Sequence, residues 1–381
     1  MYISKQKSKT TPYPKEIYYE ECIRQFQGIP SIAITKNGRI FVSWESGGDH
    51  EPDPRQYLIV HYSDDFGQTW SEPVFAVCSI PQEHLWVGDI QLWVNPEGHL
   101  HIYWSQQAYK DFHPDGLKNL YMFPNLISDS RYTFLSICQN PDAEILEFSE
   151  GMYVFDGTLR NRPLVLDDKI LYPTYNEYED RFHYMVTEDG GKTFKKHLCG
   201  KKVHTDGDEG MLVRIDENTL MYFMRSKTGF VGQSVSKDKG LTWTDCENSS
   251  VITPPSRFCI DKLPDGNLVI INNDSNDTRE NMVVQLSRDR GKTWIKKLID
   301  KRWETSYPEF DYYKGKIYVV WDRERVRAKE ILFTSFTEED IQSPEFTPTI
   351  KVLSKSRFRN PLWPLFYPNW YIPENIKSDE E

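Results

Sequence analysis

The loop of residues 46–55 carries an unusual density of side chains that can transfer protons. Asp49, Glu51 and Asp53 are carboxylic acids and His50 is an imidazole, all within five positions. Either kind of group can protonate a leaving group or deprotonate a nucleophile when its pKa lies near the working pH. Their spacing does not choose among the four, so all are candidate acid/base residues.

Arginines beside small or polar residues recur along the rest of the chain. A guanidinium is planar and can bind a carboxylate through two parallel hydrogen bonds, so several arginines at one site would select an acidic ligand. Taken singly, such arginines more often form ion pairs at strand edges. The phrases that contain them, with one further candidate at the start of a strand, are Asn161-Arg162-Pro163, Arg225-Ser226, Ser256-Arg257, Arg279-Glu280, Asp322-Arg323-Glu324-Arg325 and Asp89.

The composition indicates what kind of scaffold must position these side chains. The chain has 381 residues, of which 38% are hydrophobic and 27% charged, and this is enough apolar content for a large core. Aromatic residues make up 14%, beside 21 Gly and 23 Pro, a mixture typical of many short strands joined by turns. The formal net charge of −11 argues against a nucleic-acid partner, because binding to phosphates needs a basic surface.

Four segments share the pattern S/T-x-D-x-G-x-T-W/F. In each, the Asp and Ser or Thr side chains can bond nearby backbone amides, Gly permits a left-handed turn, and the aromatic residue can pack on a neighbour. Alternating strands precede them, so we expect each at a hairpin turn. The last three aspartates are 49 and 51 positions apart, a period typical of β-propellers. The segments are residues 63–70, 187–194, 236–243 and 287–294.

A strand–turn–strand phrase recurs six times, at residues 31–44, 89–104, 164–175, 211–224, 258–272 and 309–321. We therefore predict an all-β fold, a six-bladed β-propeller with Asp-box hairpins, over residues 16–342. Residues 1–15 are expected to form a flexible segment, and the Pro-rich and aromatic residues 343–381 a tail packed on the propeller. The strand-like residues 16–20 are expected to complete the last blade.

The boxes and the six units resemble the Asp-box propellers of the sialidase (neuraminidase) superfamily. That resemblance implies a tyrosine nucleophile, a glutamate that takes its proton, an aspartate acid/base in a loop of the first blade, and three arginines that bind the substrate carboxylate. By position in the blades, Tyr307 matches the nucleophile, Glu209 its partner, and Arg225 and Arg279 the second and third arginines.

Two features depart from the family pattern. The first arginine belongs to an Arg-Ile-Pro phrase, which here reads Gly28-Ile29-Pro30, and Arg24 could replace it only by a different route. The acid/base loop is also unusual and leaves its four candidates open. Both departures resemble a sialidase-like subgroup whose relatives include enzymes that act on glycans bearing uronic acids.

Three hypotheses follow. The first is a retaining exo-glycoside hydrolase that acts on an acidic-sugar glycan, sialic acid or a related sugar. The second is a uronate-glycan lyase, with His50 or Tyr307 as base, or an atypical exo-glycosidase on rhamnose–uronate linkages. The third is a carbohydrate-binding propeller without catalysis. In the first, the catalytic candidates are Tyr307, Glu209, Asp49, Asp53 and His50, and the substrate-binding candidates are Arg225, Arg279, Glu51, Asp89, Arg162, Arg257 and Arg323.

Neither a metal nor a cofactor is expected. The six cysteines lie far apart, with no CxxC pair and no histidine at zinc spacing. No apolar run is long enough to span a membrane, and the polar N-terminus lacks the apolar stretch of a secretory signal. We therefore expect a cytoplasmic protein whose partner is an acidic oligosaccharide, with neither nucleic acid nor membrane involved.

Overall fold

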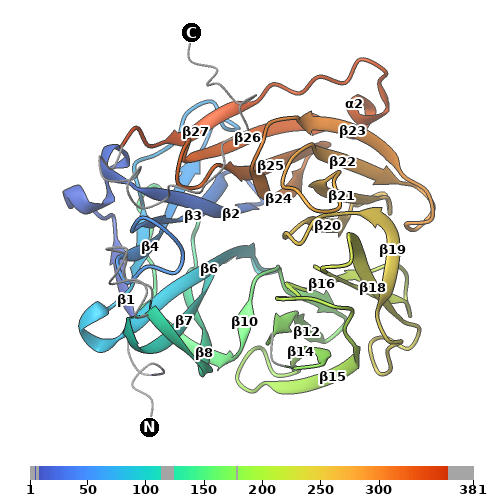
Figure 1. The fold of residues 1–381 in the computed structure, drawn as a ribbon, viewed down its shortest axis with the longest axis horizontal. Coiled ribbons are helices and arrows are strands. Elements are labelled where there is room, and N and C mark those ends of the chain that lie inside the picture. Colours follow the sequence, from blue (N-terminus) through green and yellow to red (C-terminus); the bar gives the residue numbers. More distant parts are fainter. Residues whose placement is uncertain (1–4, 6–7, 113–123, 177–178, 359–381) are drawn as a thin grey trace.

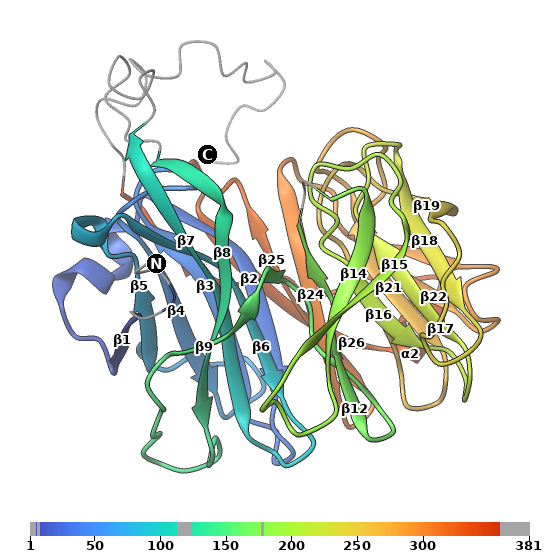
Figure 2. The same ribbon diagram turned by 90° about the horizontal axis from the view of Figure 1, so that it is seen from below.

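The computed structural model describes residues 5, 8–112, 124–176 and 179–358. Its strands form six blades arranged round a central axis (Figure 1), which confirms the predicted all-β, six-bladed propeller. The inner edge strand of each blade, which in the first blade is β2 (Phe26–Ile34), faces this axis, and the strands run roughly along it (Figure 2). Among the described residues, no helix is both long and apolar enough to cross a bilayer.

The first three blades occupy the N-terminal half of the chain. Blade one is a five-stranded sheet whose order is β1-β5-β4-β3-β2, and the main sheets of blades two and three have four strands each. The strands are β1 (Lys9–Pro12), β2 (Phe26–Ile34), β3 (Ile40–Gly47), β4 (Gln56–Ser63), β5 (Phe75–Cys78), β6 (Leu85–Val94), β7 (Leu100–Phe112), β8 (Pro124–Cys138), β9 (Met152–Asp156), β10 (Thr158–Leu159), β11 (Leu164–Leu166), β12 (Lys169–Tyr172), β13 (Thr174–Tyr175), β14 (Arg181–Thr187) and β15 (Lys195–Lys201).

Blades four to six are four-stranded antiparallel sheets in chain order. Short 3-10 turns at Ile17–Tyr19, Glu21–Ile23 and Pro81–Glu83 and one short helix, α2 (Glu338–Gln342), complete the described elements. The strands are β16 (Met211–Arg214), β17 (Leu220–Met224), β18 (Phe230–Ser236), β19 (Glu247–Ile252), β20 (Cys259–Lys262), β21 (Leu268–Asn273), β22 (Met282–Ser287), β23 (Ile295–Asp300), β24 (Thr305–Tyr313), β25 (Lys316–Arg323), β26 (Glu330–Thr337) and β27 (Lys351–Lys355).

The ends of the propeller differ from expectation. Residues 16–20 contain a 3-10 turn instead of a strand, because Tyr18 and Tyr19 pack their rings on Tyr57. The last blade is completed by β27, so it extends beyond residue 342. Within the segment expected to be flexible, β1 pairs with β5. Residues 359–381 of the expected tail lie outside the described residues.

Each Asp box lies at the hairpin between the third and fourth strands of its blade, as predicted. In the first, Asp65 accepts hydrogen bonds from the backbone N–H and the hydroxyl of Thr69, at 2.8 and 2.6 Å. The same bonds recur at the other three boxes. Bonds from the threonine hydroxyl and amide lower the pKa of Asp238 and Asp289 to about 2.

The ring is closed by hydrogen bonds between β2 and the last blade. The backbone N–H of Gln27 donates to the carbonyl of Arg325 at 2.9 Å, and its side-chain amide donates to the carbonyl of Lys329 at 2.7 Å. The carbonyl oxygen of the Gln27 side chain accepts from the Trp44 indole at 3.0 Å and the Ser354 hydroxyl at 3.0 Å. One fully buried glutamine therefore connects the first and last blades.

Replacing Gln27 with alanine should destabilise the fold by about 3 kcal/mol, because it leaves several buried donors and acceptors unpaired. Denaturant unfolding of Gln27→Ala measures this free energy. Gln68→Ala, an exposed glutamine in the same blade, serves as control and should change stability by about 0.5 kcal/mol or less. Equal stability of the two variants would contradict the role given to Gln27.

Candidate active site

Four residues at the starts of inner strands have left-handed backbone conformations. They are Ile29, Asp89, Glu209 and Tyr307, with φ between 40° and 57°. Three of them lie at register shifts in the pairing of β2, β6 and β24 with their neighbours. A bulge re-aims a side chain, and such backbone strain gathers at functional sites. The blades therefore direct these positions toward one mouth of the central axis.

Tyr307 lies at the centre of this mouth and is 7% exposed. Its hydroxyl accepts a hydrogen bond from Nη1 of Arg225 at 3.1 Å. Three more guanidinium groups lie near its ring, those of Arg325, Arg279 and Arg160, at 4.3, 5.5 and 5.7 Å from the centroid. Burial raises the pKa of Tyr307, so the phenol is neutral until a base removes its proton.

Glu209 is the carboxylate that shares a donor with this tyrosine. Nη1 of Arg225 lies 3.1 Å from Oε2 of Glu209 and also bonds Tyr307, while Nη2 lies 3.2 Å from Asp206. The geometry suits a base beside a phenol whose developing negative charge is already met by a guanidinium. The structure thus brings together Tyr307, Glu209 and Arg225, as the sequence predicts.

The acid loop divides its four candidates between two environments. Asp49, His50 and Asp53 turn away from the mouth and pair with one another and with Arg55. Nη2 of Arg55 lies 2.6 Å from Asp53 and 3.1 Å from Asp49, and Nδ1 of His50 lies 2.6 Å from Asp49. His50 and Arg55 lower the pKa of Asp49 in spite of its burial. Gly48, at φ +40°, permits the loop, since a Cβ there would lie 2.3 Å from Cγ of Asp53.

Those three residues place possible metal-ligand atoms within 4.8 Å of one another. Arg55, however, already supplies the positive charge that balances both carboxylates. The arrangement is therefore an internal ion-pair cluster that fixes the loop.

Glu51 points the opposite way, into the mouth. Its Oε2 lies 3.2 Å from Nη1 of Arg325. Burial raises the pKa of Glu51 to about 7, although the arginine acts in the other direction. A carboxyl group that keeps its proton near neutral pH can act as a general acid. The sequence offered Glu51 both as one of four possible proton donors and as a binding residue, and its position favours the acid/base role.

A cavity of about 240 Å³ lies over these groups. Glu51, Asp89, Glu209, Arg225 and Tyr307 line it on the polar side. Trp86, Arg131 and Tyr175 add aromatic and cationic surface, and Asp206 and Gly207 complete one edge. Acidic, basic and aromatic groups therefore meet at one opening, as in a site for a charged sugar.

Two arginines from the predicted binding set, Arg162 and Arg257, line a separate and smaller cavity of about 70 Å³. Arg257 is 2% exposed and pairs with Glu309 at 3.1 Å, and Arg162 pairs with Asp311 at 3.0 Å. Arg160, which the sequence reading did not single out, lies 3.9 Å from both Asp89 and Glu309. Arg257 also donates to the carbonyl of Pro308 at 2.8 Å, and the Arg160 guanidinium lies 5.7 Å from the Tyr307 ring, so these two buried arginines support the strand that carries Tyr307.

Two other arginines are placed away from the mouth. Arg323 pairs with Glu330 at 3.1 Å on the outer side of β25. Arg24 donates to the carbonyl of Tyr19 at 2.7 Å and to Gln27 at 3.1 Å, so its side chain belongs to the blade closure.

Several site residues were not identified as site residues from sequence. Glu45 lies buried under the cavity and accepts from the backbone N–H of Asp89 at 2.5 Å, and burial raises its pKa well above the usual range. Arg325 stood in a noted phrase, but Arg323 was chosen from it. The sequence signal that could have pointed to the mouth is a pair of residues near the start of an inner strand, such as Gly28-Ile29 in β2 or Ser306-Tyr307 in β24. The remaining site residues that were not identified from sequence are Trp86, Arg131, Tyr175, Asp206 and Arg160.

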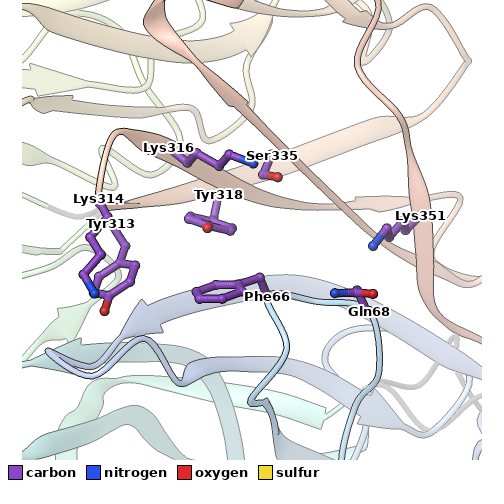
Figure 3. A pocket seen from close by; sticks show the side chains of 8 residues that line it. All are labelled: Phe66, Gln68, Tyr313, Lys314, Lys316, Tyr318, Ser335 and Lys351. Carbon is purple, nitrogen blue, oxygen red and sulfur yellow. The ribbon is translucent and has the colours of Figure 1, made fainter.

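A larger cavity, about 520 Å³, lies at the opposite end of β24, beside the first Asp box. Figure 3 shows its lining, in which the ring of Phe66 lies beneath Tyr318, with lysines around them. The two rings are 6.4 Å apart and nearly parallel. None of the predicted catalytic or binding residues is among the described residues that line it, so the candidate site remains the mouth at Tyr307.

The sequence profile described as "BNR repeat-like domain" matches residues 38–319. The chain belongs to this family. A relative named Sialidase, from Bacteroides fragilis (strain YCH46), is 23% identical over 311 residues, which are 70% of this chain and 53% of the relative. The chain thus spans about half the length of that relative.

Solved sialidase structures share the fold. NanB sialidase from Streptococcus pneumoniae superposes with a TM-score of 0.63 at 15% identity, over 82% of this chain and 68% of that one. The intramolecular trans-sialidase from Ruminococcus gnavus also gives 0.63, at 13% identity, over 84% and 96%. Together with the family match, these likenesses confirm a BNR-repeat propeller of the sialidase superfamily.

Arg279 differs from Arg225, Arg325 and Arg160 at the mouth in having no polar partner among the described residues. In the described part of the chain it forms no hydrogen bond or ion pair, and its guanidinium faces the Tyr307 ring. Burial lowers its pKa, and the nearby charges of Arg325 and Arg225 add to this effect. A partly buried cation that has no carboxylate partner among the described residues costs stability and marks a place for an anion.

Arg279→Met should therefore raise the free energy of unfolding by about 1–2 kcal/mol, because it removes a partly desolvated charge that has no carboxylate partner among the residues described. The matched control, Arg257→Met, should lower it by about 3–5 kcal/mol, because Glu309 would lose its closest ion-pair partner and Oδ1 of Asn161 would lose its donors. Denaturant unfolding of both variants checks the opposite signs. A loss of stability of similar size in both would mean that Arg279 is a structural residue.

Proposed function

We propose that the protein is a retaining exo-glycoside hydrolase that cleaves glycosides of an acidic sugar, sialic acid or a related one. The observation that supports it most is the shared contact of Arg225 with Tyr307 and Glu209, next to Arg279, which has no carboxylate partner in the part of the chain that the structure describes. Sialidase relatives and structural neighbours favour the same class of activity.

A tyrosine suits a substrate whose anomeric carbon bears a carboxylate. An anionic carboxylate nucleophile would be repelled by that group, whereas a neutral phenol is not. Glu209 would take the proton as Tyr307 attacks the anomeric carbon, and Arg225 would stabilise the phenolate oxygen. Arg279 and Arg225 would hold the substrate carboxylate through charge-assisted hydrogen bonds.

Glu51 would supply the proton to the leaving oxygen and later deprotonate the water that releases the sugar. Its carboxyl group lines the cavity. Asp49 and Asp53 pair with Arg55, His50 bonds Asp49, and none of the three is among the described residues that line the cavity. The leaving sugar would lie against Trp86, Arg131 and Tyr175, which line the same cavity. No cofactor enters this scheme.

The lyase alternative requires a base beside the proton to be removed. His50, one of its two candidates, bonds Asp49 and is not among the residues that line the cavity. Tyr307 remains as the other. Ultraviolet absorbance of the product distinguishes the two chemistries, because elimination leaves an unsaturated uronate and hydrolysis does not.

Tyr307→Phe removes the attacking oxygen and leaves the ring in place. We expect kcat on an aryl sialoside or a related acidic glycoside to fall at least about 10³-fold, with ligand affinity changed much less. Tyr175→Phe, in the wall of the same cavity, is the matched control and should retain most of the activity. Full turnover by Tyr307→Phe would rule out the tyrosine mechanism.

The pKa of Glu51 predicts the alkaline limb of the pH profile. A general acid must be protonated, so kcat/KM should fall tenfold per pH unit above about 7. Glu51→Gln should abolish this limb and lower the rate about 10²–10⁴-fold for a poor leaving group, but less for a 4-nitrophenyl leaving group. The exposed Glu72→Gln should preserve both rate and profile. An unchanged limb in Glu51→Gln would assign the acid role elsewhere.

A further inference from the structure

Gly28 holds the strand position at which the superfamily pattern has its first arginine, and the side chain of Arg325 fills the space above it. A Cβ on Gly28 would lie 2.8 Å from both Cγ and Cδ of Arg325. We propose that Arg325 provides the third arm of the carboxylate clamp, and that the absence of a side chain at position 28 makes room for it.

Arg325 comes from the turn between β25 and β26, and three contacts fix its course. Its carbonyl accepts from the backbone N–H of Gln27 at 2.9 Å, which holds the turn against β2. Its Nε donates to Oδ2 of Asp322 at 3.1 Å, and the same oxygen accepts from the backbone N–H of Ile29 at 2.7 Å. Asp322 therefore orients the guanidinium and the strand beneath it together.

The guanidinium faces the reacting groups. Its carbon lies 4.3 Å from the centroid of the Tyr307 ring, and Nη1 lies 3.2 Å from Glu51. With Arg225 bonded to the Tyr307 hydroxyl and Arg279 beside the ring, three guanidinium groups surround the tyrosine. Arg225 and Arg325 each have carboxylates of the protein as partners, and Arg279 has none among the described residues.

This arrangement fits a ligand carboxylate next to the atom that Tyr307 attacks. The inference rests on the proposed function, because it names the substrate class of that same site: a sugar with a carboxylate on its anomeric carbon. When such a carboxylate binds Nη1 of Arg325, it replaces Glu51 there. The Glu51 carboxyl group is then released from its arginine at the moment when it must carry a proton.

Three variants test the roles proposed for Gly28 and Arg325: Arg325→Ala, Gly28→Arg and the double variant Gly28→Arg/Arg325→Ala. The ligands are 2-deoxy-2,3-didehydro-N-acetylneuraminic acid and its methyl ester, with binding measured by calorimetry. Arg327→Ala is the matched control, since this arginine of the same turn pairs with Glu304 and Glu324 away from the site. Thermal unfolding of every variant identifies those that have lost the fold.

The wild-type protein should prefer the acid over the ester, and Arg325→Ala should lose about 10- to 100-fold in affinity for the acid alone, as expected for one bond to a charged group. Arg327→Ala should bind like the wild type. Gly28→Arg alone should bind poorly, because its side chain and that of Arg325 compete for one space. The double variant should regain most of the preference, since it supplies the arginine from the strand.

The inference fails if Arg325→Ala keeps the preference for the acid, if the wild-type protein shows none, or if the folded double variant does not regain it. Binding is measured separately from turnover. A wild-type protein that binds the acid through Arg325 but hydrolyses no sialoside would overturn the proposed hydrolase function and leave this inference intact. If the wild-type protein hydrolyses sialosides but Arg325→Ala keeps the preference for the acid over the ester, the hydrolase function stands and this inference fails.

Discussion

Positive charge buried at one mouth of the propeller constrains the rest of the structure. Three guanidinium groups lie within 6 Å of the Tyr307 ring, and a fourth bonds its hydroxyl. Three of these four guanidinium groups pair with carboxylates, and Arg279 has no such partner among the described residues. Removing one side of a buried pair would leave the other unpaired in a poorly solvated site. The carboxylates that balance them come from several blades, among them Glu51, Asp322, Glu209 and Glu309. The circle of six blades must therefore close accurately for these charges to meet.

That requirement explains why strained backbone at the mouth and the contacts that join the first and last blades involve the same residues. The inner strands carry left-handed residues where they reach the mouth, and a β-branched residue such as Ile29 takes this conformation at a cost. Its backbone N–H bonds Asp322, the carboxylate that also orients Arg325. The contact that closes the ring between β2 and the last blade is thus the contact that positions a cation at the site. Stability and site geometry share the same residues here.

The fold was predictable because its signals are local. Each Asp box fixes its own turn through bonds within a few residues, so the sequence period reveals the blades. The proximity of Tyr307, Glu209 and Arg225 was predictable through the resemblance to the sialidase superfamily, which matches them by their places in the blades. Glu51 could not be separated from Asp49 and Asp53, because the choice depends on which of them pair with Arg55. Arg325 was missed because its role depends on a gap at Gly28, nearly 300 positions away in the chain.

The overall charge of −11 and the cationic mouth impose opposite demands on an acidic ligand. Net charge acts at long range and is screened by salt over about 8–10 Å, so it slows encounter more than it weakens contact. Inside the cavity, Arg279 has no carboxylate partner among the described residues, and hydrogen bonds to a partly desolvated guanidinium are strong. Affinity at such a site depends on direct contacts with the carboxylate, while the negative exterior disfavours anions that cannot make them. Under the proposed function, selectivity for one acidic sugar would therefore arise at the Tyr307 ring, where guanidinium groups converge, and would owe little to steering by the surface.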